Sequence, residues 1–230
     1  MKNKTIFLTG NSSGLGKALN KKLVKENRIY SISKSKSSFN NEQHLIFDFN
    51  KVSNLYEKMR RFDNIEKIDF LILNAGVLGD INKSFKTKHT NLQKVININL
   101  ISNKIILDFF LEKKVIIKNV IAISSGAALN PKEGWLEYCV SKCAMKMLID
   151  VYSIENKRIS FLNLSPGIIK TKMQKKIFLN KNDIETLKKF KKLYINDKMD
   201  YPDTVATKII NYLNSRKEKK KNYVDLRNIN

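Results

Sequence analysis

A tyrosine and a lysine stand four positions apart, Tyr138 and Lys142, in a segment whose apolar spacing is typical of a helix. Residues four apart lie on one face of a helix, so the phenol and the ammonium are neighbours. A free tyrosine has a pKa of about 10 and exchanges protons slowly at neutral pH. A nearby ammonium favours the phenolate, which suits the pair to acid–base chemistry. The spacing occurs in many amphipathic helices, so the interpretation needs support from other residues.

A glycine-rich turn near the start of the chain has the residues to hold phosphate groups. It runs Thr9-Gly10-Asn11-Ser12-Ser13-Gly14-Leu15-Gly16, between a predicted strand and a predicted helix. Glycines permit a tight turn and a close approach of a pyrophosphate, and the helix N-terminus offers unpaired N–H groups. A dinucleotide-binding motif requires this strand–turn–helix context. An ordinary surface turn is the alternative.

Short β-rich runs alternate with longer helical patterns along the chain, which indicates a parallel sheet covered by helices. The predicted strands are 4–9, 28–33, 44–48, 68–74, 115–124, 159–164 and 223–226. The predicted helices are 15–26, 52–61, 92–112, 136–155, 184–194 and 204–213. We therefore expect one domain over residues 1–230, an α/β Rossmann fold with a doubly wound parallel sheet of about seven strands and helices on both faces.

The composition limits the possible classes of protein. The 230 residues are 42% apolar and 28% charged, as in a soluble globular protein, and no apolar run reaches the roughly 20 residues of a membrane span. Cys139 and Cys143 are too few for a disulfide framework, and with two histidines a metal site is not expected. We expect a cytoplasmic protein. The net charge of +23 raises the question of nucleic acid, but it is spread along the chain without a recognition motif, so we expect no nucleic-acid partner.

The spacing Thr-Gly-x3-Gly-x-Gly from Thr9 to Gly16 resembles the nucleotide motif of the classical short-chain dehydrogenases/reductases. Further matches follow in the family's order: Asp48 at the end of the third predicted strand, Asn74-Ala75-Gly76 after the fourth, and Pro166-Gly167 after the sixth, with Thr171 close behind. The resemblance covers nearly the whole chain and implies the family's fold. It implies cofactor contacts from Gly10, Ser12, Ser13, Gly14, Leu15, Gly16, Ser33, Lys34, Asp48, Phe49, Asn74, Ala75, Gly76, Tyr138, Lys142, Pro166, Gly167, Ile169 and Thr171.

The resemblance also supplies partners for the Tyr–Lys pair. Ser125 stands thirteen residues before Tyr138 at the end of a predicted strand, and Asn99 lies in the preceding long helix. With Lys142 they match the family's Asn-Ser-Tyr-Lys tetrad. The resemblance implies that Tyr138 gives a proton to the substrate's carbonyl oxygen and that Ser125 hydrogen-bonds this oxygen. It further implies that Lys142 lowers the tyrosine pKa and holds the nicotinamide ribose, that Asn99 positions a proton-relaying water, and that the cofactor supplies the hydride.

The residues after the second predicted strand bear on which nicotinamide cofactor is used. An acidic residue there would bond the adenosine ribose and repel a 2′-phosphate. This chain has Ser33-Lys34-Ser35-Lys36, and an ammonium with hydroxyls beside it suits a phosphate. We therefore predict NADP(H). Lysines are common in this chain, so an unspecialised exposed loop is the alternative. An arginine that the family often has before the middle glycine is Ser13 here.

Two stretches resemble a narrower group, the sepiapterin reductases and the bacterial benzil reductases. One is Asn74-Ala75-Gly76-Val77-Leu78-Gly79-Asp80, and the other is Ile123-Ser124-Ser125-Gly126-Ala127-Ala128, followed by Gly134-Trp135 and Tyr138-Cys139. Ser165-Pro166-Gly167 and Thr171-Lys172-Met173-Gln174 add to this resemblance. These enzymes use NADPH to reduce carbonyls, often one of a vicinal pair, and Asp225 matches the aspartate that anchors the pterin in sepiapterin reductase. The resemblance implies a homodimer or homotetramer and a substrate-covering segment at 171–202. It implies substrate contacts from Ser125, Trp135, Tyr138, Met173 and Asp225. From its position alone, Trp135 is either such a pocket wall or a core residue.

The sequence thus predicts an NADPH-dependent reductase of a small ketone or vicinal dicarbonyl. One alternative is an enzyme acting on another alcohol–ketone pair, such as a ketosugar. The other is a non-catalytic NADP(H)-binding regulator on the same fold, against which the complete tetrad argues.

Overall fold

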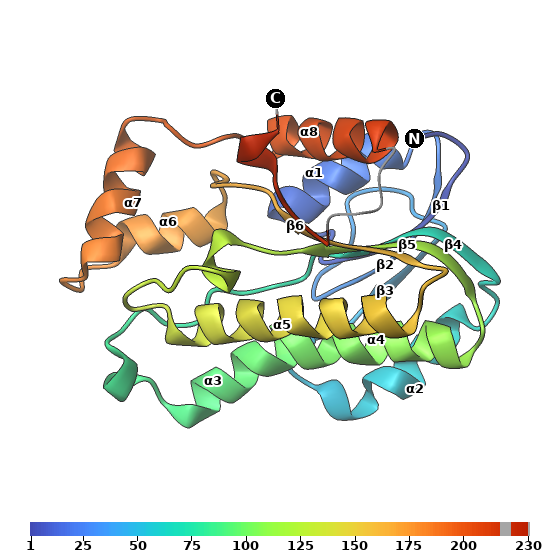
Figure 1. Ribbon diagram of the computed structural model, residues 1–230, viewed down its shortest axis with the longest axis horizontal. Helices are drawn as coiled ribbons and strands as arrows, with labels where there is room; N and C mark the ends of the chain where they lie inside the picture. Colours follow the sequence, from blue (N-terminus) through green and yellow to red (C-terminus); the bar gives the residue numbers. More distant parts are fainter. Residues whose placement is uncertain (217–221, 230) are drawn as a thin grey trace.

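Seven parallel strands form the central sheet in the order β3-β2-β1-β4-β5-β6-β7 (Figure 1). The structure, a computed structural model, describes residues 1–216 and 222–229. The strands are β1 (Thr5–Thr9), β2 (Arg28–Ser33), β3 (Gln43–Ile46), β4 (Lys67–Leu73), β5 (Ile116–Ile123), β6 (Ser160–Ser165) and β7 (Tyr223–Asp225). The strand order reverses between β1 and β4, and in such sheets ligands bind beyond the carboxyl ends of the strands at this switch point.

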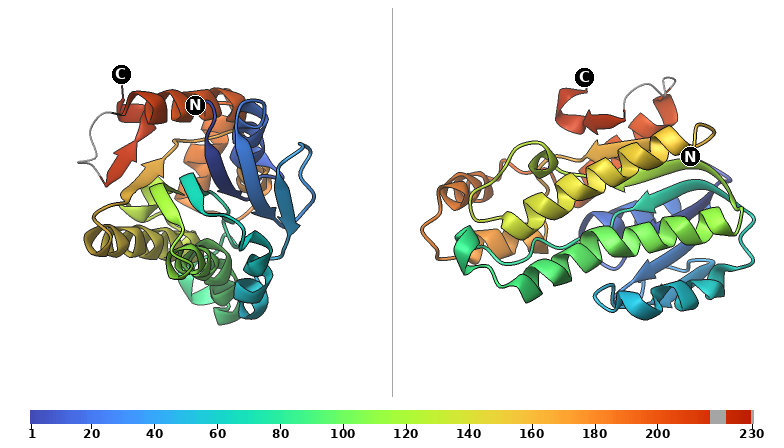
Figure 2. Two further views of the ribbon diagram at one scale, coloured as in Figure 1. Left: turned by 90° about the vertical axis from the view of Figure 1, so that its right-hand side faces the viewer. Right: turned by 60° about the horizontal axis from the view of Figure 1, so that its bottom comes forward.

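Helices cover both faces of the sheet, as Figures 1 and 2 show. One face carries α1 (Gly14–Leu23) and α8 (Pro202–Ser215). The other carries α2 (Leu55–Met59), α3 (His89–Ile96), α4 (Ser102–Glu112) and α5 (Leu136–Glu155). The predicted Rossmann fold, with its doubly wound sheet, is therefore confirmed.

The alternation of side chains along the strands explains the two layers. On β1, Ile6 and Leu8 are fully buried toward α1 and α8, whereas Phe7 points to the opposite face. Phe7 meets Phe62 and Phe110 edge to face, with ring centroids 5.0 and 4.9 Å apart. Each such pair adds about 0.5–1.5 kcal/mol beyond the burial of area. A strand buried on both sides has no polar face, which is why its sequence is continuously apolar.

The segment predicted to cover the substrate leaves the sheet after β6 and forms α6 (Lys172–Leu179) and α7 (Glu185–Ile195), which stand beyond the sheet in Figure 1. The segment returns beside its starting point, because Ile169 pairs with Asp200 in an isolated bridge. Helix α6 was not predicted from the sequence. Its eight residues, KMQKKIFL, include three lysines, so the apolar signal is short.

The segment 92–112, predicted as one long helix, is helical throughout but contains a π-helical turn, Asn97–Ile101, which separates α3 from α4. Such turns insert one extra residue and are frequent at functional sites, and Asn99 lies in this one. The predicted helix 52–61 is likewise a short α-helix between two 3-10 turns. Strand β3 ends at Ile46, so Asp48 and Phe49 follow the strand instead of closing it.

Candidate active site

A cavity of about 1150 Å³ opens at the carboxyl ends of the strands. Small-molecule sites usually measure about 300–1,000 Å³, so this one has room for an extended ligand. Every residue predicted to contact the cofactor lines it, from the turn after β1 to the loop after β6. Of the other predicted site residues, Ser125, Trp135 and Met173 also line the cavity, whereas Asn99 and Asp225 do not.

The glycine turn after β1 forms a cradle that only glycine permits. Gly10 and Gly14 have φ angles of 71° and 52°, in the left-handed region. A Cβ at Gly16 would lie 2.1 Å from the Gly10 carbonyl oxygen, so the turn and the helix are packed as closely as the backbone allows. The side chain of Ser13, the N-cap of α1, caps no N–H group. The first N–H groups of α1 are therefore available to a pyrophosphate, which fits a dinucleotide.

The segment after β4 braces this turn. The Asn74 side-chain amide donates to the carbonyls of Thr9 and Gly10, at 3.0 and 3.2 Å. In return, the Thr9 hydroxyl accepts from the backbone N–H groups of Asn74 and Ala75, both at 2.9 Å. These bonds join the two strand ends on either side of the switch point and so fix the floor of the cavity.

Lys34 lies at the rim of the cavity, where a 2′-phosphate was predicted. Its ammonium is 2.8 Å from a carboxylate oxygen of Asp48, and its side chain is 72% exposed. The hydrogen bond from Lys34 holds the pKa of the Asp48 carboxyl below its ordinary value. The Ser33 hydroxyl donates to the Ser35 carbonyl at 2.7 Å. Among these rim residues the flexible Lys34 side chain is thus the group best able to turn toward a ligand.

Tyr138 and Lys142 lie on α5 and are both buried, with 9% and 5% of their surface exposed. The Lys142 ammonium donates to the Ile123 carbonyl at 2.7 Å and lies 5.8 Å from the centre of the Tyr138 ring. Burial raises the pKa of Tyr138 to about 12, and the adjacent Ser125 hydroxyl opposes this shift. Burial lowers the pKa of Lys142 to about 8. At neutral pH the phenol is therefore protonated and the amine is largely cationic.

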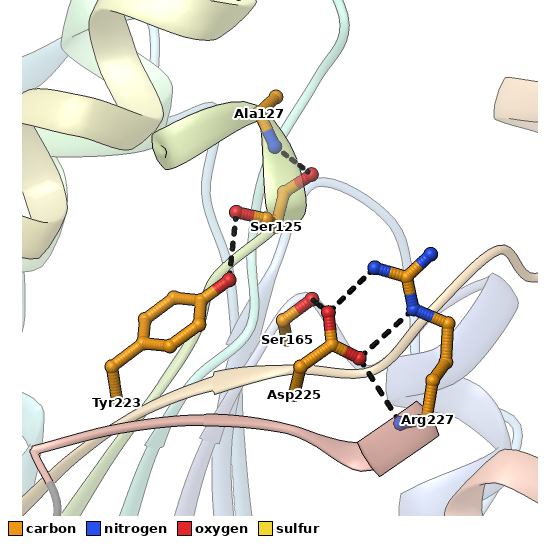
Figure 3. Close-up of polar contacts among 6 residues, drawn as sticks. All are labelled: Ser125, Ala127, Ser165, Tyr223, Asp225 and Arg227. Atoms are coloured by element: carbon orange, nitrogen blue, oxygen red, sulfur yellow. Dashed lines mark hydrogen bonds and ion pairs between the residues drawn. The ribbon is translucent and has the colours of Figure 1, made fainter. Parts of the chain in front are cut away.

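Ser125 follows β5 and begins a short 3-10 turn, Gly126–Ala128. Its hydroxyl accepts the N–H of Ala127 at 3.1 Å, and its carbonyl accepts the Tyr223 hydroxyl at 3.3 Å (Figure 3). Neither contact uses the hydroxyl hydrogen of Ser125, and this hydroxyl lies beside the Tyr138 phenol. The neighbouring Ser124 also lines the cavity, and its buried hydroxyl has no hydrogen-bond partner.

Asn99 is buried behind the cavity wall. Its side-chain amide donates to the Val77 carbonyl and to the Ser141 hydroxyl, both at 2.9 Å, and its side-chain oxygen accepts the Val77 N–H at 2.8 Å. The Asn99 carbonyl accepts the Asn103 amide at 2.9 Å. Asn99 therefore joins the loop after β4 to α5. The predicted water relay to Lys142 stays a prediction.

The residues predicted to contact the substrate divide into two groups. Trp135 is buried at the cavity wall, edge to face with Tyr138 and 4.9 Å from the Phe190 ring, so it is both a core residue and a pocket wall. Asp225, by contrast, does not reach the cavity, because its carboxylate binds Arg227 and accepts the Ser165 hydroxyl at 3.3 Å (Figure 3).

Several cavity residues were missing from the sequence prediction, among them Gln174, Lys189, Phe190 and Arg227. Phe190 lies in a predicted helix, but nothing in its spacing shows that this helix folds back over Trp135. Arg227 follows the predicted last strand. Its position two residues after Asp225 was the only feature of the sequence that could have indicated a place near the substrate.

The chain belongs to the short chain dehydrogenase family, whose profile matches residues 4–182. It is therefore an oxidoreductase of this family, and the resemblance seen in the motifs is confirmed. A benzil reductase ((S)-benzoin forming) of Bacillus subtilis is 28% identical over 227 residues, which cover 90% of this chain and 92% of that protein. The sepiapterin reductase of Rattus norvegicus is 32% identical over 171 residues, which cover 70% of this chain and 65% of that protein.

Solved structures show the same fold. A short chain dehydrogenase/reductase from Saccharomyces cerevisiae superposes with a TM-score of 0.86 at 24% identity, covering 99% of this chain and 97% of its own. A short chain dehydrogenase from Shigella flexneri, solved as a complex with NADP, gives 0.79 at 18% identity and covers 99% and 98%. In the described part of this chain, no helix is long and apolar enough to cross a membrane.

Proposed function

We propose that this oxidoreductase uses NADPH to reduce a small ketone or vicinal dicarbonyl, with Tyr138 as the proton donor. The observation that carries the proposal is the meeting of Tyr138, Ser125 and Lys142 at one wall of the cavity whose floor is the glycine turn. When bound, the cofactor supplies a hydride to the carbonyl carbon. The chain's own residues then have to orient the carbonyl, exclude water and deliver one proton to its oxygen.

The protonation states suit reduction. With a pKa of about 12, the Tyr138 phenol carries its proton at neutral pH and can donate it. Negative charge then develops on the phenol oxygen, and the nearby Lys142 ammonium stabilises it. The Ser125 hydroxyl beside Tyr138 donates to the carbonyl oxygen and stabilises it while charge builds there.

The cofactor preference rests on the rim around Lys34. No acidic residue follows β2 directly, and the exposed Lys34 ammonium can exchange Asp48 for a phosphate. A phosphate carries more charge than a carboxylate and offers several acceptor oxygens, which makes it a strong partner for this ammonium. These features support NADPH over NADH.

The substrate class rests on the pocket wall and the relatives. Trp135, Phe190 and Ile177 give the cavity an apolar wall beside Tyr138, which fits an aromatic or apolar carbonyl compound. The names of two relatives specify benzil and sepiapterin as substrates.

The test follows the loss of NADPH absorbance with diketones, sepiapterin and nucleotide-linked ketosugars, using wild type and Tyr138→Phe. We expect turnover of at least one diketone and a loss of at least about 100-fold in kcat for Tyr138→Phe. Tight NADPH binding with every carbonyl left unreduced would favour the regulator instead. Unchanged turnover in Tyr138→Phe would refute Tyr138 as the proton donor.

We also propose a cytoplasmic homodimer that packs through α5. Four exposed apolar residues follow one another at intervals of seven, four and three, a stripe on one face of the helix: Val140, Met147, Val151 and Ile154. A second copy of the same stripe is the simplest complementary surface. Light scattering after size exclusion should give twice the chain mass of 26.7 kDa, and Met147→Glu should lower it toward one chain. A wild-type mass of one chain would contradict the dimer.

A further inference from the structure

Arg227 occupies the place at the cavity where the sequence predicted an acidic substrate anchor. It lines the cavity, unlike Asp225, and lies next to Gly126 and Gly167, which follow β5 and β6. A Cβ at Gly126 would lie 3.6 Å from the Nη2 atom of Arg227, and one at Gly167 would lie 3.3 Å from its Cγ. Gly126 directly follows Ser125. The guanidinium therefore lies close to the residue proposed to bind the substrate carbonyl.

The guanidinium has one edge occupied and one edge open. Asp225 accepts from Nε at 2.9 Å and from Nη2 at 2.6 Å, and it also accepts the backbone N–H of Arg227 at 3.0 Å. Figure 3 shows the remaining terminal nitrogen turned away from the carboxylate. The side chain is 56% exposed, so water reaches this outer edge. An open Nη1–Nη2 edge matches the two oxygens of a carboxylate.

Asp225 fixes the direction of this edge. Its carboxylate is only 11% exposed and also accepts the Ser165 hydroxyl, so it is anchored to β6. An arginine held by such a carboxylate loses little conformational entropy when it binds a ligand. Asp225 is thus a positioning residue for Arg227.

The rest of the cavity wall adds positive charge. Its two acidic residues nearest the covering helices are already paired, Glu133 with Lys83 and Glu185 with Lys188. Within the described part of the chain, several lysines of the wall make no ion pair: Lys94, Lys132, Lys172 and Lys189. The field in the cavity therefore favours an anionic ligand.

We propose that Arg227 determines substrate specificity by binding a carboxylate, so that the preferred substrate is an oxo acid whose carboxylate lies a few bonds from the reduced carbonyl. This rests on the proposed reductase function. The hydride adds to the ketone carbon, Tyr138 gives its proton to the oxygen, NADPH becomes NADP⁺, and the product is a hydroxy acid. The carboxylate takes no part in the reaction and serves as a handle.

The experiment compares phenylglyoxylate with its methyl ester, which differ in the negative charge. In wild type we expect kcat/KM for the acid to exceed that for the ester by at least about 10-fold. Arg227→Met should lower kcat/KM for the acid by about 10- to 100-fold, the loss expected for a hydrogen-bonded charge, mainly through KM. The same variant should change the value for the ester by less than about 2-fold, and Arg227→Lys should retain part of the preference.

Arg28→Met is the matched control, because Arg28 forms an exposed ion pair with Glu42 and does not line the cavity. It removes the same charge and should leave the acid–ester ratio unchanged. A binding measurement gives a second readout that needs no turnover. Trp135 is the chain's only tryptophan and lines the cavity, so phenylglyoxylate should quench its fluorescence in the presence of NADP⁺, more weakly in Arg227→Met.

The outcomes separate the two proposals. Reduction of the ester and of benzil without preference for the acid, or equal losses for acid and ester in Arg227→Met, would overturn the role of Arg227 and leave the reductase intact. Absence of reduction for every carbonyl would overturn the reductase. In that case, quenching by phenylglyoxylate that depends on Arg227 would still support an anion site, and its absence would refute one.

Discussion

Replacing Asn99 by alanine tests whether this residue is mainly architectural. Its side chain satisfies both backbone groups of Val77 and contacts Ser141 from a position that is 1% exposed. In Asn99→Ala, the Val77 N–H and C=O both lose their partner. An unsatisfied buried group costs about 1–3 kcal/mol, and these two bonds are part-buried, so we expect the free energy of unfolding to fall by about 2–4 kcal/mol. The Ser141 hydroxyl adds little, because it still donates to the Tyr138 carbonyl at 2.9 Å.

Urea denaturation followed by circular dichroism gives this free energy, and the melting temperature should fall by roughly 5–15 °C for a chain of this size. Asn97→Ala is the control, since Asn97 lies in the same π turn but makes exposed contacts only. We expect a change within about 0.5 kcal/mol there.

A loss below about 0.5 kcal/mol in Asn99→Ala would refute the architectural reasoning. A stable Asn99→Ala protein that binds NADPH normally and has lost turnover would favour the water relay instead. Both outcomes differ from the expected one, in which the variant is less stable and its activity is lost because the fold is weakened.

Three further changes test the site. Because burial lowers the pKa of Lys142 to about 8, the ammonium loses its proton as the pH rises through that value. The value of kcat/KM for reduction should therefore be constant below about pH 8 and fall above it. A kcat/KM that stays constant to about pH 9.5 would contradict this prediction. Lys34→Glu should lower kcat/KM with NADPH by about 10- to 100-fold and raise kcat/KM with NADH. The control is Lys36→Glu, which lies outside the cavity and should change neither value. Equal effects in both variants would rule out a contact between Lys34 and the phosphate. Gly16→Ala should weaken NADPH binding in a fluorescence titration far more than Gly14→Ala. A Cβ at position 14 would meet Thr171 at an ordinary 3.5 Å, and the positive φ there would cost about 1–2 kcal/mol of backbone strain. A larger loss of binding in Gly14→Ala would refute the argument that Gly16 is needed for close packing.

The cofactor half of the site was predictable from the sequence because its requirements are local. Gly10, Gly14 and Gly16 are needed for backbone conformation and close packing within one short turn, so their spacing is visible in the chain. Tyr138 and Lys142 share a helix, and four-residue spacing places them together in any α-helix. The substrate half was less predictable, because α6 and α7 carry weak apolar patterns and reach the cavity only through tertiary packing against Trp135.

Arg227 is the clearest example of a site residue whose role depends on tertiary contacts. The sequence placed an aspartate in the last strand and a resemblance gave it a substrate role. In the structure Arg227 lines the cavity, whereas Asp225 stays outside it and accepts a hydrogen bond from Ser165, sixty residues away in the chain. No local pattern encodes that contact.

The sequence by itself determined the strand–helix alternation, the phosphate-binding turn and the Tyr138–Lys142 pair, since each follows from backbone geometry over a few residues. Only the tertiary structure decided that Asn99 joins Val77 to α5, that Trp135 closes the pocket against Phe190, and that Arg227 faces the cavity in place of Asp225. The physical reason is the same in each case. These contacts join segments far apart in the chain, and their geometry is set by how strand ends and loops meet at one edge of the sheet.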